Sequence, residues 1–289
     1  MSIPKFTLPA WIKQHTFEYD PANLPEEHVE RIRLKLKKFT SSDPLVSIVI
    51  PAYNEEENIL NTLSSIAEVE LDYPTELFIV NNNSKDRTQE ILDILEVRSV
   101  FQPEQGIKHA RQMGLEKARG KFLLQADADS IYPPTWGPDY VEALKDPKVM
   151  MVYGRHSIIP SAGTSRVSLG FYEMAAGILY NIRERNRQYI NVLGFNSAFR
   201  TEDALHKGSY EHTPQGSEDG HMAMTLMQYG QLKHIPSNRV RAWTSDRRLM
   251  EAGSFSAAFA RRFKREASRL VEYVKGTELP EDEKPTPIS

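Results

Sequence analysis

The sequence of 289 residues contains no cysteine, no long apolar run and no excess of positive charge. Disulfide bonds, zinc–thiolate sites and cysteine nucleophiles are therefore excluded, which fits a reducing compartment. No run approaches the roughly 18 apolar residues of a membrane span, and residues 1–10 lack the apolar core of a signal peptide. The net charge of −3 argues against nucleic acid as the main partner. We expect a soluble cytoplasmic protein.

The sequence does contain two carboxylates at the end of an apolar run. Residues 122–125 have the length and apolarity of a buried strand, and Asp127 and Asp129 follow, separated by Ala128. Two hard oxygen ligands at the end of a strand suit a divalent cation whose other ligands are water and phosphate. A turn rich in aspartate is the alternative, and the short pattern alone does not decide between them.

Strands and helices alternate through the first half of the chain. A continuous β-branched run is typical of a strand buried in a parallel sheet, and residues 46–50 are such a run. We expect Pro51, Ala52 and Tyr53 to end this strand. Asn54 is expected either to cap the next helix, with Glu57 at the spacing of a capping box, or to contact the ligand. Further strands are expected at 77–80, 97–101 and 121–125. The order predicts a doubly wound α/β sheet with ligands at the carboxyl ends of its strands.

Beyond residue 134 the pattern becomes mixed. Helices are expected at 135–145, 168–185 and 217–229. Strands are expected at 149–153, 191–200, 232–235 and 240–244, the second of them with Gly194 inside it. We therefore expect a domain over 45–248, divided into a nucleotide-binding half at 45–134 and an acceptor half at 135–248.

Two appendages flank this domain. Residues 1–44 contain an expected helix at 26–39, and residues 249–289 contain an expected amphipathic, basic helix at 255–274 before a disordered end rich in proline and glutamate. Each helix either packs on the domain or contacts a membrane surface, and the first has a protein partner as a further alternative.

Five motifs in a fixed order resemble the family 2 glycosyltransferases, the inverting enzymes with the GT-A fold. The motifs cover about residues 46–245 and are the opening strand with its loop, a polar run, a glycine–arginine segment, the D-x-D and a late Glu-Asp pair. In this sequence they are residues 46–55, 81–88, 106–111, 127–129 and 218–219. The resemblance implies a GT-A fold in which a mixed sheet is flanked by helices.

The resemblance implies a nucleoside-diphosphate sugar as donor, with a UDP-sugar favoured, and Mg²⁺ or Mn²⁺ as cofactor. Asp129 is the main expected metal ligand, and Asp127 binds metal or ribose. Arg111 reaches base or phosphate, with a surface salt bridge as its alternative, and Arg247 with Arg248 would cover the diphosphate. The residues expected to contact the donor are Pro51, Ala52, Tyr53, Glu55, Asn81, Asn82, Arg111, Asp127, Ala128, Asp129, Arg247 and Arg248.

On the acceptor side, the resemblance implies that Asp219 is the general base that takes a proton from the acceptor hydroxyl. Asn196, Glu218 and His221 are the expected acceptor contacts, with a structural role as the alternative for His221. The run 194–197, which contains Asn196, matches a family strand near the acceptor and is expected to contact the acceptor or the donor sugar. The alternative for residues 218–219 is a pair of carboxylates that caps a helix, because acidic side chains are favoured at helix N-termini. The acceptor is expected to be a saccharide or a lipid-linked molecule, and a lipid acceptor would place the protein at the inner face of the membrane.

One departure from the family pattern concerns the nucleotide. Asn81 and Asn82 stand where the family usually has two aspartates. An asparagine both donates and accepts hydrogen bonds, so uridine is no longer clearly favoured over guanosine or thymidine. We expect metal-dependent inverting sugar transfer in the synthesis of a cell-surface polysaccharide or glycolipid. A nucleotidyltransferase and a non-catalytic sugar-nucleotide-binding scaffold are the alternatives.

Overall fold

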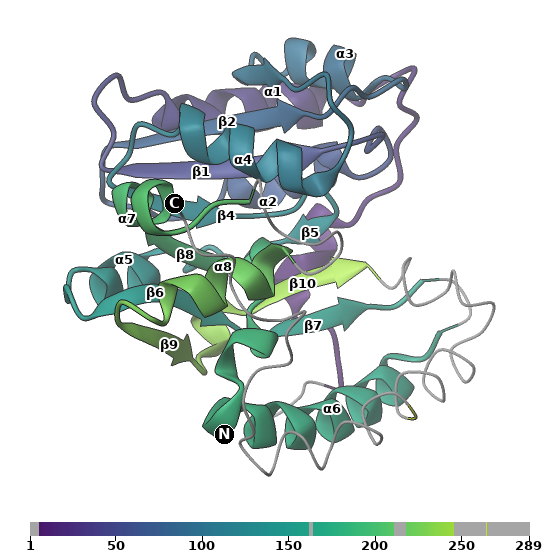
Figure 1. Cartoon of the computed structure of the whole chain (residues 1–289). Helices are drawn as coiled ribbons and strands as arrows, with labels where there is room; N and C mark the ends of the chain where they lie inside the picture. Colours follow the sequence, from purple (N-terminus) through teal and green to yellow (C-terminus); the bar gives the residue numbers. More distant parts are fainter. Residues whose placement is uncertain (1–5, 162–163, 211–217, 246–263, 265–289) are drawn as a thin grey trace.

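The protein is described by a computed structural model that covers residues 6–161, 164–210, 218–245 and 264. Its centre is a seven-stranded sheet in the order β3-β2-β1-β4-β8-β6-β9 (Figure 1). The strands are β1 Val46–Ala52, β2 Thr75–Asn81, β3 Ser99–Phe101, β4 Phe122–Gln125, β6 Val149–Gly154, β8 Ser197–Arg200 and β9 Gln231–Ile235. The first four are mutually parallel, whereas β8 runs antiparallel to both β4 and β6. This mixed sheet confirms the predicted α/β fold class.

A second, three-stranded sheet lies beside the first and has the order β5-β10-β7. Its strands are β5 Ser130–Ile131, β7 His156–Ile159 and β10 Ala242–Ser245. Because β5 directly follows the two aspartates, its pairing with β10 joins the loop at Asp129 to a strand more than a hundred residues later.

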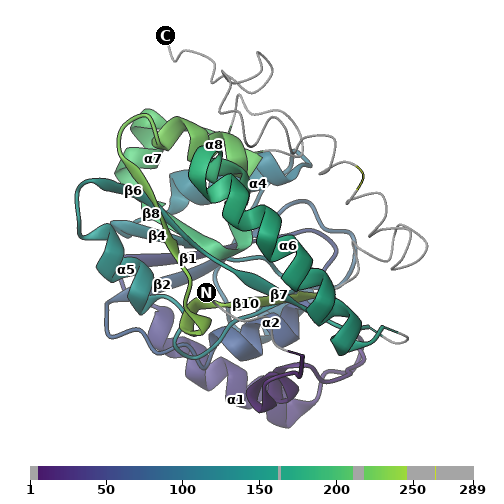
Figure 2. The ribbon, with the colours of Figure 1, turned by 90° about the horizontal axis from the view of Figure 1, so that it is seen from below.

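Helices cover both faces of the large sheet (Figure 2). One face carries α1, α2 and α5, and the other carries α4, α7 and α8. The helices are α1 Glu26–Leu36, α2 Ile59–Ile66, α3 Thr88–Ile94, α4 Ile107–Lys117, α5 Pro138–Leu144, α6 Arg166–Asn186, α7 Thr201–Lys207 and α8 Glu218–Leu226. Short 3₁₀ turns are η1 Ala10–His15, η2 Lys37–Phe39, η3 Gln188–Asn191, η4 Gly194–Asn196 and η5 Asn238–Val240.

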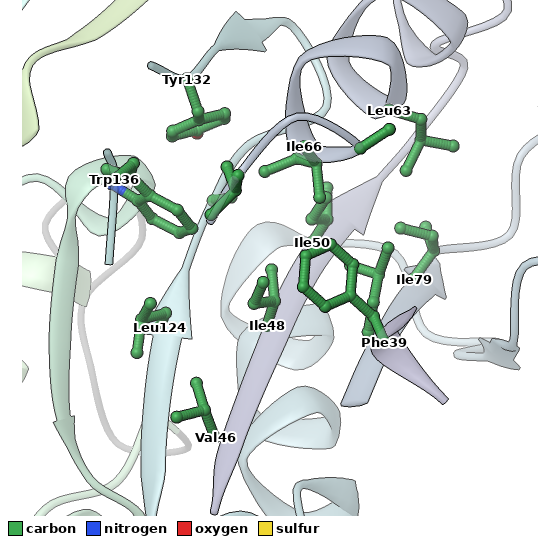
Figure 3. Packing of buried hydrophobic residues seen from close by; sticks show 14 of the residues in the cluster. Phe39, Val46, Ile48, Ile50, Leu63, Ile66, Ile79, Leu124, Tyr132 and Trp136 are labelled. Atoms are coloured by element: carbon green, nitrogen blue, oxygen red, sulfur yellow. The ribbon is translucent and has the colours of Figure 1, made fainter. Parts of the chain in front are cut away.

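The alternation of side chains along β1 explains the two layers. Ile48 and Ile50 pack into the core cluster under α1 and α2, whereas Val49 between them belongs to the cluster on the opposite face. Successive side chains of a strand point to opposite faces, so a strand that is buried at every position, as β1 is, must be covered on both faces. Figure 3 shows the first cluster, in which Trp136 and Tyr132 close the end next to Leu124.

The expected helix at 26–39 packs on the domain. Ile32, Leu36 and Phe39 are at most 5% exposed and belong to the same cluster as β1. The apolar stripe that would contact a membrane or a partner is therefore used inside the protein. The expected helix at 255–274 lies outside the described residues, apart from Lys264.

Three local predictions are wrong. Pro51 and Ala52 extend β1 to its end and do not break it. A proline is tolerated there because β4 pairs with β1 only as far as Val49, so the missing N–H costs no ladder bond. Asn54 caps no helix, since α2 starts at Ile59. The strand expected at 191–200 is regular only from Ser197, after two 3₁₀ turns.

Candidate active site

A cavity of about 580 Å³ opens at the carboxyl ends of β1 and β4. It brings together residues from both halves of the chain, as expected for the crevice at the ends of parallel strands. Of the residues predicted from the sequence, it is lined by Pro51, Ala52, Tyr53, Glu55, Asn82, Arg111, Asp127, Ala128, Asp129, Glu218 and Asp219.

The loop after β1 forms one wall of the cavity. Tyr53 is 47% exposed at the rim, where its ring is accessible to a base. Glu55 is 9% exposed and accepts a hydrogen bond from Asn58 Nδ2 at 2.7 Å, while its own N–H donates to Thr88 Oγ1. Asn54, at a φ of 53°, accepts from the N–H of Lys85 and so joins this loop to the next one. The wall is thus held before any ligand arrives.

The two asparagines that depart from the family pattern have different positions. Asn81 is 3% exposed and does not line the cavity: its amide donates to Gln89 Oε1 and accepts from the N–H of Ser84. Asn82 lines the cavity, but its amide is used to hold the loop before α4. It donates to the carbonyls of Gln102 and Glu104 and accepts from the N–H of Gly106.

These bonds explain why an asparagine is present at position 82. A carboxylate there would have no hydrogen to donate to either carbonyl and would face both with a negative charge. The loop it holds ends at Gly106, which has a φ of 137° and precedes the first residue of α4. Asn82 therefore shapes the cavity wall through its neighbours.

Asp127 and Asp129 follow β4 on a loop that is fixed from three sides. The N–H of Asp127 donates to Tyr132 Oη at 2.9 Å, and the Tyr132 hydroxyl donates onward to the carbonyl of Phe195. Thr62 Oγ1, on α2, donates to the carbonyl of Ala128 at 2.7 Å. Both carboxylates line the cavity, with Asp127 only 8% exposed.

This pair of aspartates fits a divalent cation that is completed by its ligand. Among the described residues no group of three or more His, Cys, Asp or Glu side chains could hold a metal alone. Mg²⁺ binds proteins through one or two carboxylates and keeps other positions for water and phosphate oxygens, and Mn²⁺ also prefers oxygen ligands. Two carboxylates at the wall of a cavity large enough for a nucleotide match that requirement.

Arg111, on α4, connects the two sides of the site. Its guanidinium lies 3.3 Å from Asp127 Oδ1 and 3.2 Å from Asp219 Oδ1, and only 3% of the side chain is exposed. Burial alone would lower the pKa of Arg111, but the two carboxylates hold that pKa above its ordinary value. The predicted alternative of a surface salt bridge does not describe this buried ion-pair network.

Asp219 lies in the first turn of α8, and its pKa is raised above the ordinary value of an aspartate. Its Oδ2 accepts from the N–H of Gly194 at 2.7 Å. Burial raises the pKa of Asp219 from 3.8 to about 6, with a smaller upward contribution from Glu218, and Arg111 and the bond from Gly194 only partly offset it. A carboxylate of this pKa is still largely ionised at neutral pH and is a stronger base than an exposed one.

Gly194 is required by close packing at this point. A Cβ built on it would lie 2.2 Å from Asp219 Oδ1 and 2.3 Å from Arg111 Cζ. Every side chain larger than hydrogen would therefore displace the carboxylate or the guanidinium. The sequence placed Gly194 in a strand and in a run expected to contact the acceptor or the donor sugar, but gave no sign of this packing against Asp219 and Arg111.

Asn196 and His221 were also predicted, but neither lines the cavity. Asn196 is 1% exposed, and its amide is saturated by Trp136, Tyr140 and the carbonyls of Arg155 and Val240. His221 lies on α8 but is absent from the cavity wall. Arg247 and Arg248 lie outside the described residues. Phe195, from the run 194–197 expected to contact the acceptor or the donor sugar, does line the cavity. The wall also includes residues that were not among the expected contacts, namely Gln105, Gly106, Ile107, Ala110 and Leu193.

Gly106, Ile107 and Ala110 lie in the glycine–arginine motif at 106–111, so the sequence contained a signal for these three residues. Leu193 had no such signal, because it reaches the cavity from irregular backbone just before η4.

Comparison with known protein families identifies the chain. The model of the family described as "Glycosyl transferase family 2" matches residues 47–205, more than half of the sequence. The chain belongs to glycosyl transferase family 2. This confirms the family predicted from the five motifs.

Two curated relatives show how far the sequence likeness extends. The glycosyltransferase AglE of Haloferax volcanii is 33% identical over 137 residues, which is 44% of either chain. A dolichol-phosphate mannosyltransferase of Saccharomyces cerevisiae is 36% identical over 109 residues, or 35% of this chain and 41% of the relative. The alignments thus span less than half the length of these relatives.

Solved structures share the fold over most of the chain. A mannosyltransferase from Pyrobaculum calidifontis in complex with GDP-Man and Mn²⁺ has a TM-score of 0.55 and 21% identity, and covers 86% of this chain and 79% of its own. Glucosyl-3-phosphoglycerate synthase from Mycobacterium tuberculosis, in complex with Mn²⁺, UDP-glucose and glycerol 3-phosphate, has a TM-score of 0.52 and 18% identity over 87% of this chain and 86% of its own. The GT-A fold is confirmed. Within the described part of the chain, no helix is both long and apolar enough to cross a membrane.

Proposed function

We propose that this family member transfers a sugar from a nucleoside-diphosphate sugar to a hydroxyl acceptor, with inversion at the anomeric carbon and with Mg²⁺ or Mn²⁺ as cofactor. The observation that carries the proposal is a single cavity in which Asp127 and Asp129 lie on one side and Asp219 on the other, with Arg111 between Asp127 and Asp219. That arrangement separates a place for the diphosphate from a place for a base.

The chain binds the donor along the β1 side of the cavity. Tyr53 offers a ring for the nucleoside base, and Asp127 with Asp129 would hold the cation. When bound, the cation supplies positive charge to the departing diphosphate. Mn²⁺ in the two solved structures that share this fold supports a divalent ion. The amide of Asn82 is used by its own loop, so this residue does not decide between nucleotide bases. Both donors are therefore tested, a UDP-sugar first and a GDP-sugar second.

The chain handles the proton with Asp219. As the acceptor oxygen forms its bond to the anomeric carbon, the bond from that carbon to the diphosphate oxygen breaks and its electron pair leaves with the diphosphate. Asp219 takes the hydroxyl proton, and its raised pKa makes it a better acceptor for that proton than an ordinary carboxylate. Single displacement with inversion requires this base to lie on the face of the sugar opposite the leaving group.

The acceptor that we propose is a saccharide or a lipid-linked molecule, and its support comes from the names of relatives. The dolichol-phosphate mannosyltransferases among the relatives act, by name, on a lipid phosphate. The peripheral contact with a membrane that such an acceptor requires is part of the same proposal.

The base assignment is tested with Asp219→Asn. We expect the transfer rate to fall about 10²- to 10⁴-fold, the usual contribution of a general base, while calorimetry shows nearly unchanged donor affinity. Turnover equal to that of the unmodified protein would reject the assignment. A wild-type protein that binds donor but hydrolyses or transfers nothing would favour the scaffold alternative.

The metal assignment is tested by thermal shift with nucleotide sugars. Donor binding raises the melting temperature, and we expect the rise to require Mn²⁺ or Mg²⁺, to disappear with a chelator and to be absent in Asp129→Asn. A donor-dependent rise of the same size in the chelator would contradict it. The same screen compares UDP-sugars with GDP-sugars.

A further inference from the structure

The outer face of α6 exposes a row of large apolar side chains. The row follows helical spacings of four, three and four residues and consists of Val167, Phe171, Met174 and Ile178, which are between 46% and 62% exposed. Single exposed apolar residues are normal on a protein surface, whereas a contiguous row of them indicates a binding surface. We name these four residues the α6 stripe.

The opposite face of α6 holds the helix on the protein. Leu169 and Tyr172 are buried in one cluster with Ile158 of β7. Glu173 accepts hydrogen bonds from the N–H of Ile158 and from the guanidinium of Arg166. Because these contacts fix the rotation of α6 about its axis, the stripe stays on the outside, where α6 forms the edge of the protein (Figure 1).

The surface around the stripe is uncharged. Between Val167 and Ile182 the only charged residue is Glu173, which lies on the inner face of α6. A helix that lies on an anionic membrane carries lysine or arginine beside its apolar side, and this stretch contains neither. The small residues Ala175 and Gly177 flank the stripe and allow another helix to approach closely. The stripe therefore fits an apolar protein segment better than lipid headgroups.

The chain continues beyond β10 from a point close to the start of α6. Strand β10 ends at Ser245, which pairs in register with Ile159 of β7, and α6 begins seven residues after Ile159. Residues 246–254 can span about 30 Å when they are extended. The 21-residue helix α6 has about the same length. The segment 255–274 can therefore reach every part of the stripe.

The sequence of this segment matches the stripe in length and in pattern. The helix expected at 255–274 would be about 30 Å long. Its apolar residues share one side, and they are Phe255, Phe259, Phe263, Leu270 and Val274. Arg261, Lys264 and Arg265 face away from that side. Lys264, which the structure describes, is helical and exposed, as expected for the polar side of such a helix.

We propose that residues 255–274 dock on the α6 stripe through their apolar side. A tether of nine residues keeps the segment at an effective concentration of about 1 mM or more, so it reaches the stripe more readily than a second copy of the chain does. Docking also anchors the far end of the tether that carries Arg247 and Arg248. The proposal stands whether or not the proposed function does, because it uses no part of the catalytic cavity.

The absence of cysteine from the chain allows a direct test. Met174→Cys places a single thiol in the stripe, and its rate of reaction with a maleimide measures how well the stripe is covered. Leu34→Cys on α1 is the matched control, since Leu34 is 55% and Met174 46% exposed. We expect the thiol at 174 to react at least about tenfold more slowly, because burial of even one large apolar side chain favours docking by more than that factor.

A second substitution shows whether the segment is the cover. In the Met174→Cys chain, we expect Phe259→Asp and Phe263→Asp each to raise the reaction rate at least about fivefold, since each removes a buried ring and introduces a charge. Lys264→Asp is the control on the polar side, and we expect it to change the rate by less than about twofold. Melting temperatures verify that each chain is folded, and either of the two phenylalanine variants suffices if the other is not.

The proposal is overturned if the thiol at 174 reacts as fast as the thiol at 34, or if both phenylalanine variants leave its rate unchanged. Two other occupants have their own signatures, and finding either one also rejects the segment. A second copy gives a protection that is lost on dilution and a dimer mass in analytical ultracentrifugation. A lipid surface gives a protection that appears only when vesicles of anionic phospholipid are added.

Discussion

The carboxylate of Asp219 titrates close to two other charged side chains, Arg111 and Glu218. The pKa of Asp219 is raised to about 6 by burial and also by Glu218, while Arg111 lowers it. Only the ionised carboxylate can take a proton, so the active fraction rises as the pH increases through that value.

The first prediction concerns this pH dependence. We expect kcat/KM for transfer to rise with pH along a limb centred near 6. In Glu218→Gln the limb should move to lower pH, because a neutral neighbour no longer opposes ionisation of Asp219. A pH–rate profile of both proteins with saturating metal measures the shift. A limb that stays in place or moves upward in Glu218→Gln would contradict the electrostatic assignment.

The second prediction concerns Gly194. We expect Gly194→Ala to lower the transfer rate by about 100-fold, the scale of a misplaced reacting group, and to lower the free energy of unfolding by about 1–3 kcal/mol. Both follow from the overlap of the new methyl group with Asp219 and Arg111. Steady-state kinetics and urea unfolding measure them.

Gly220→Ala on α8 is its control. The nearest atom to a Cβ at Gly220 is 3.7 Å away, so we expect stability equal to or slightly above that of the unmodified chain. If both alanine variants lose the same activity, a general sensitivity of α8 and η4, and not the contact with Asp219, would be responsible.

Single residues differ in how well the sequence predicts them. Asp127 and Asp129 stand at the end of a strand whose pattern is clear, whereas Asp219 is indicated by the resemblance to the family, and all three line one cavity. Asn196 was assigned to the acceptor because it lies in a motif, but its four hydrogen bonds come from elements that are distant in sequence. No sequence pattern near position 196 indicates those hydrogen-bond partners.

Among the elements, the loop from Gln102 to Gly106 depends most on a distant side chain. Asn82 holds it by three hydrogen bonds, and α4 with Arg111 begins directly after it. The position of Arg111 between its two carboxylates is therefore set in part by the amide at position 82.

The third prediction concerns this amide. We expect Asn82→Asp to lower the free energy of unfolding by about 1–3 kcal/mol, because two partly buried hydrogen bonds to carbonyls lose their donor, and to weaken nucleotide binding. Asn83→Asp is the control: Asn83 donates to the carbonyl of Pro103 at an exposed position, where water replaces the bond. Urea unfolding and nucleotide calorimetry compare the two. Equal losses in both variants would mean that position 82 has no special role.

The elements were predicted well where a strand is buried on both faces and poorly where it is short. The run at β1 gives a clear signal because both faces are covered by helices. Strand β7 and helix α7 were not predicted, and β5 has only two residues. Their structure comes from pairing and packing with remote parts of the chain, which a local pattern does not contain.

At the scale of the molecule, the large sheet crosses the expected boundary between the two halves. Strand β4 of the nucleotide-binding half pairs along its whole length with β8 of the acceptor half. The core cluster under α1 and α2 likewise includes Val149, Val152 and Ala198 from the second half. The division at residue 134 describes function and remains a prediction in that sense, but the core is continuous across it.

The fourth prediction follows from this continuity. We expect a fragment of residues 1–134 to lack cooperative unfolding, since it loses the partner of β4 and part of both core clusters. Circular dichroism during thermal unfolding and the dispersion of amide NMR signals measure this. A sharp transition together with well-dispersed signals would show that the first half is an independent domain.

Strand β10 gives the protein a timing constraint during its synthesis. Residues 127–129 leave the ribosome more than a hundred residues before Trp243, which pairs with Ile131 in β5. The loop that carries the two aspartates therefore receives this backbone partner only after more than a hundred further residues have been synthesised. A nascent chain that stalls before β10 would contain both aspartates without the strand that pairs next to their loop. We therefore expect donor binding to appear only after β10 has been synthesised.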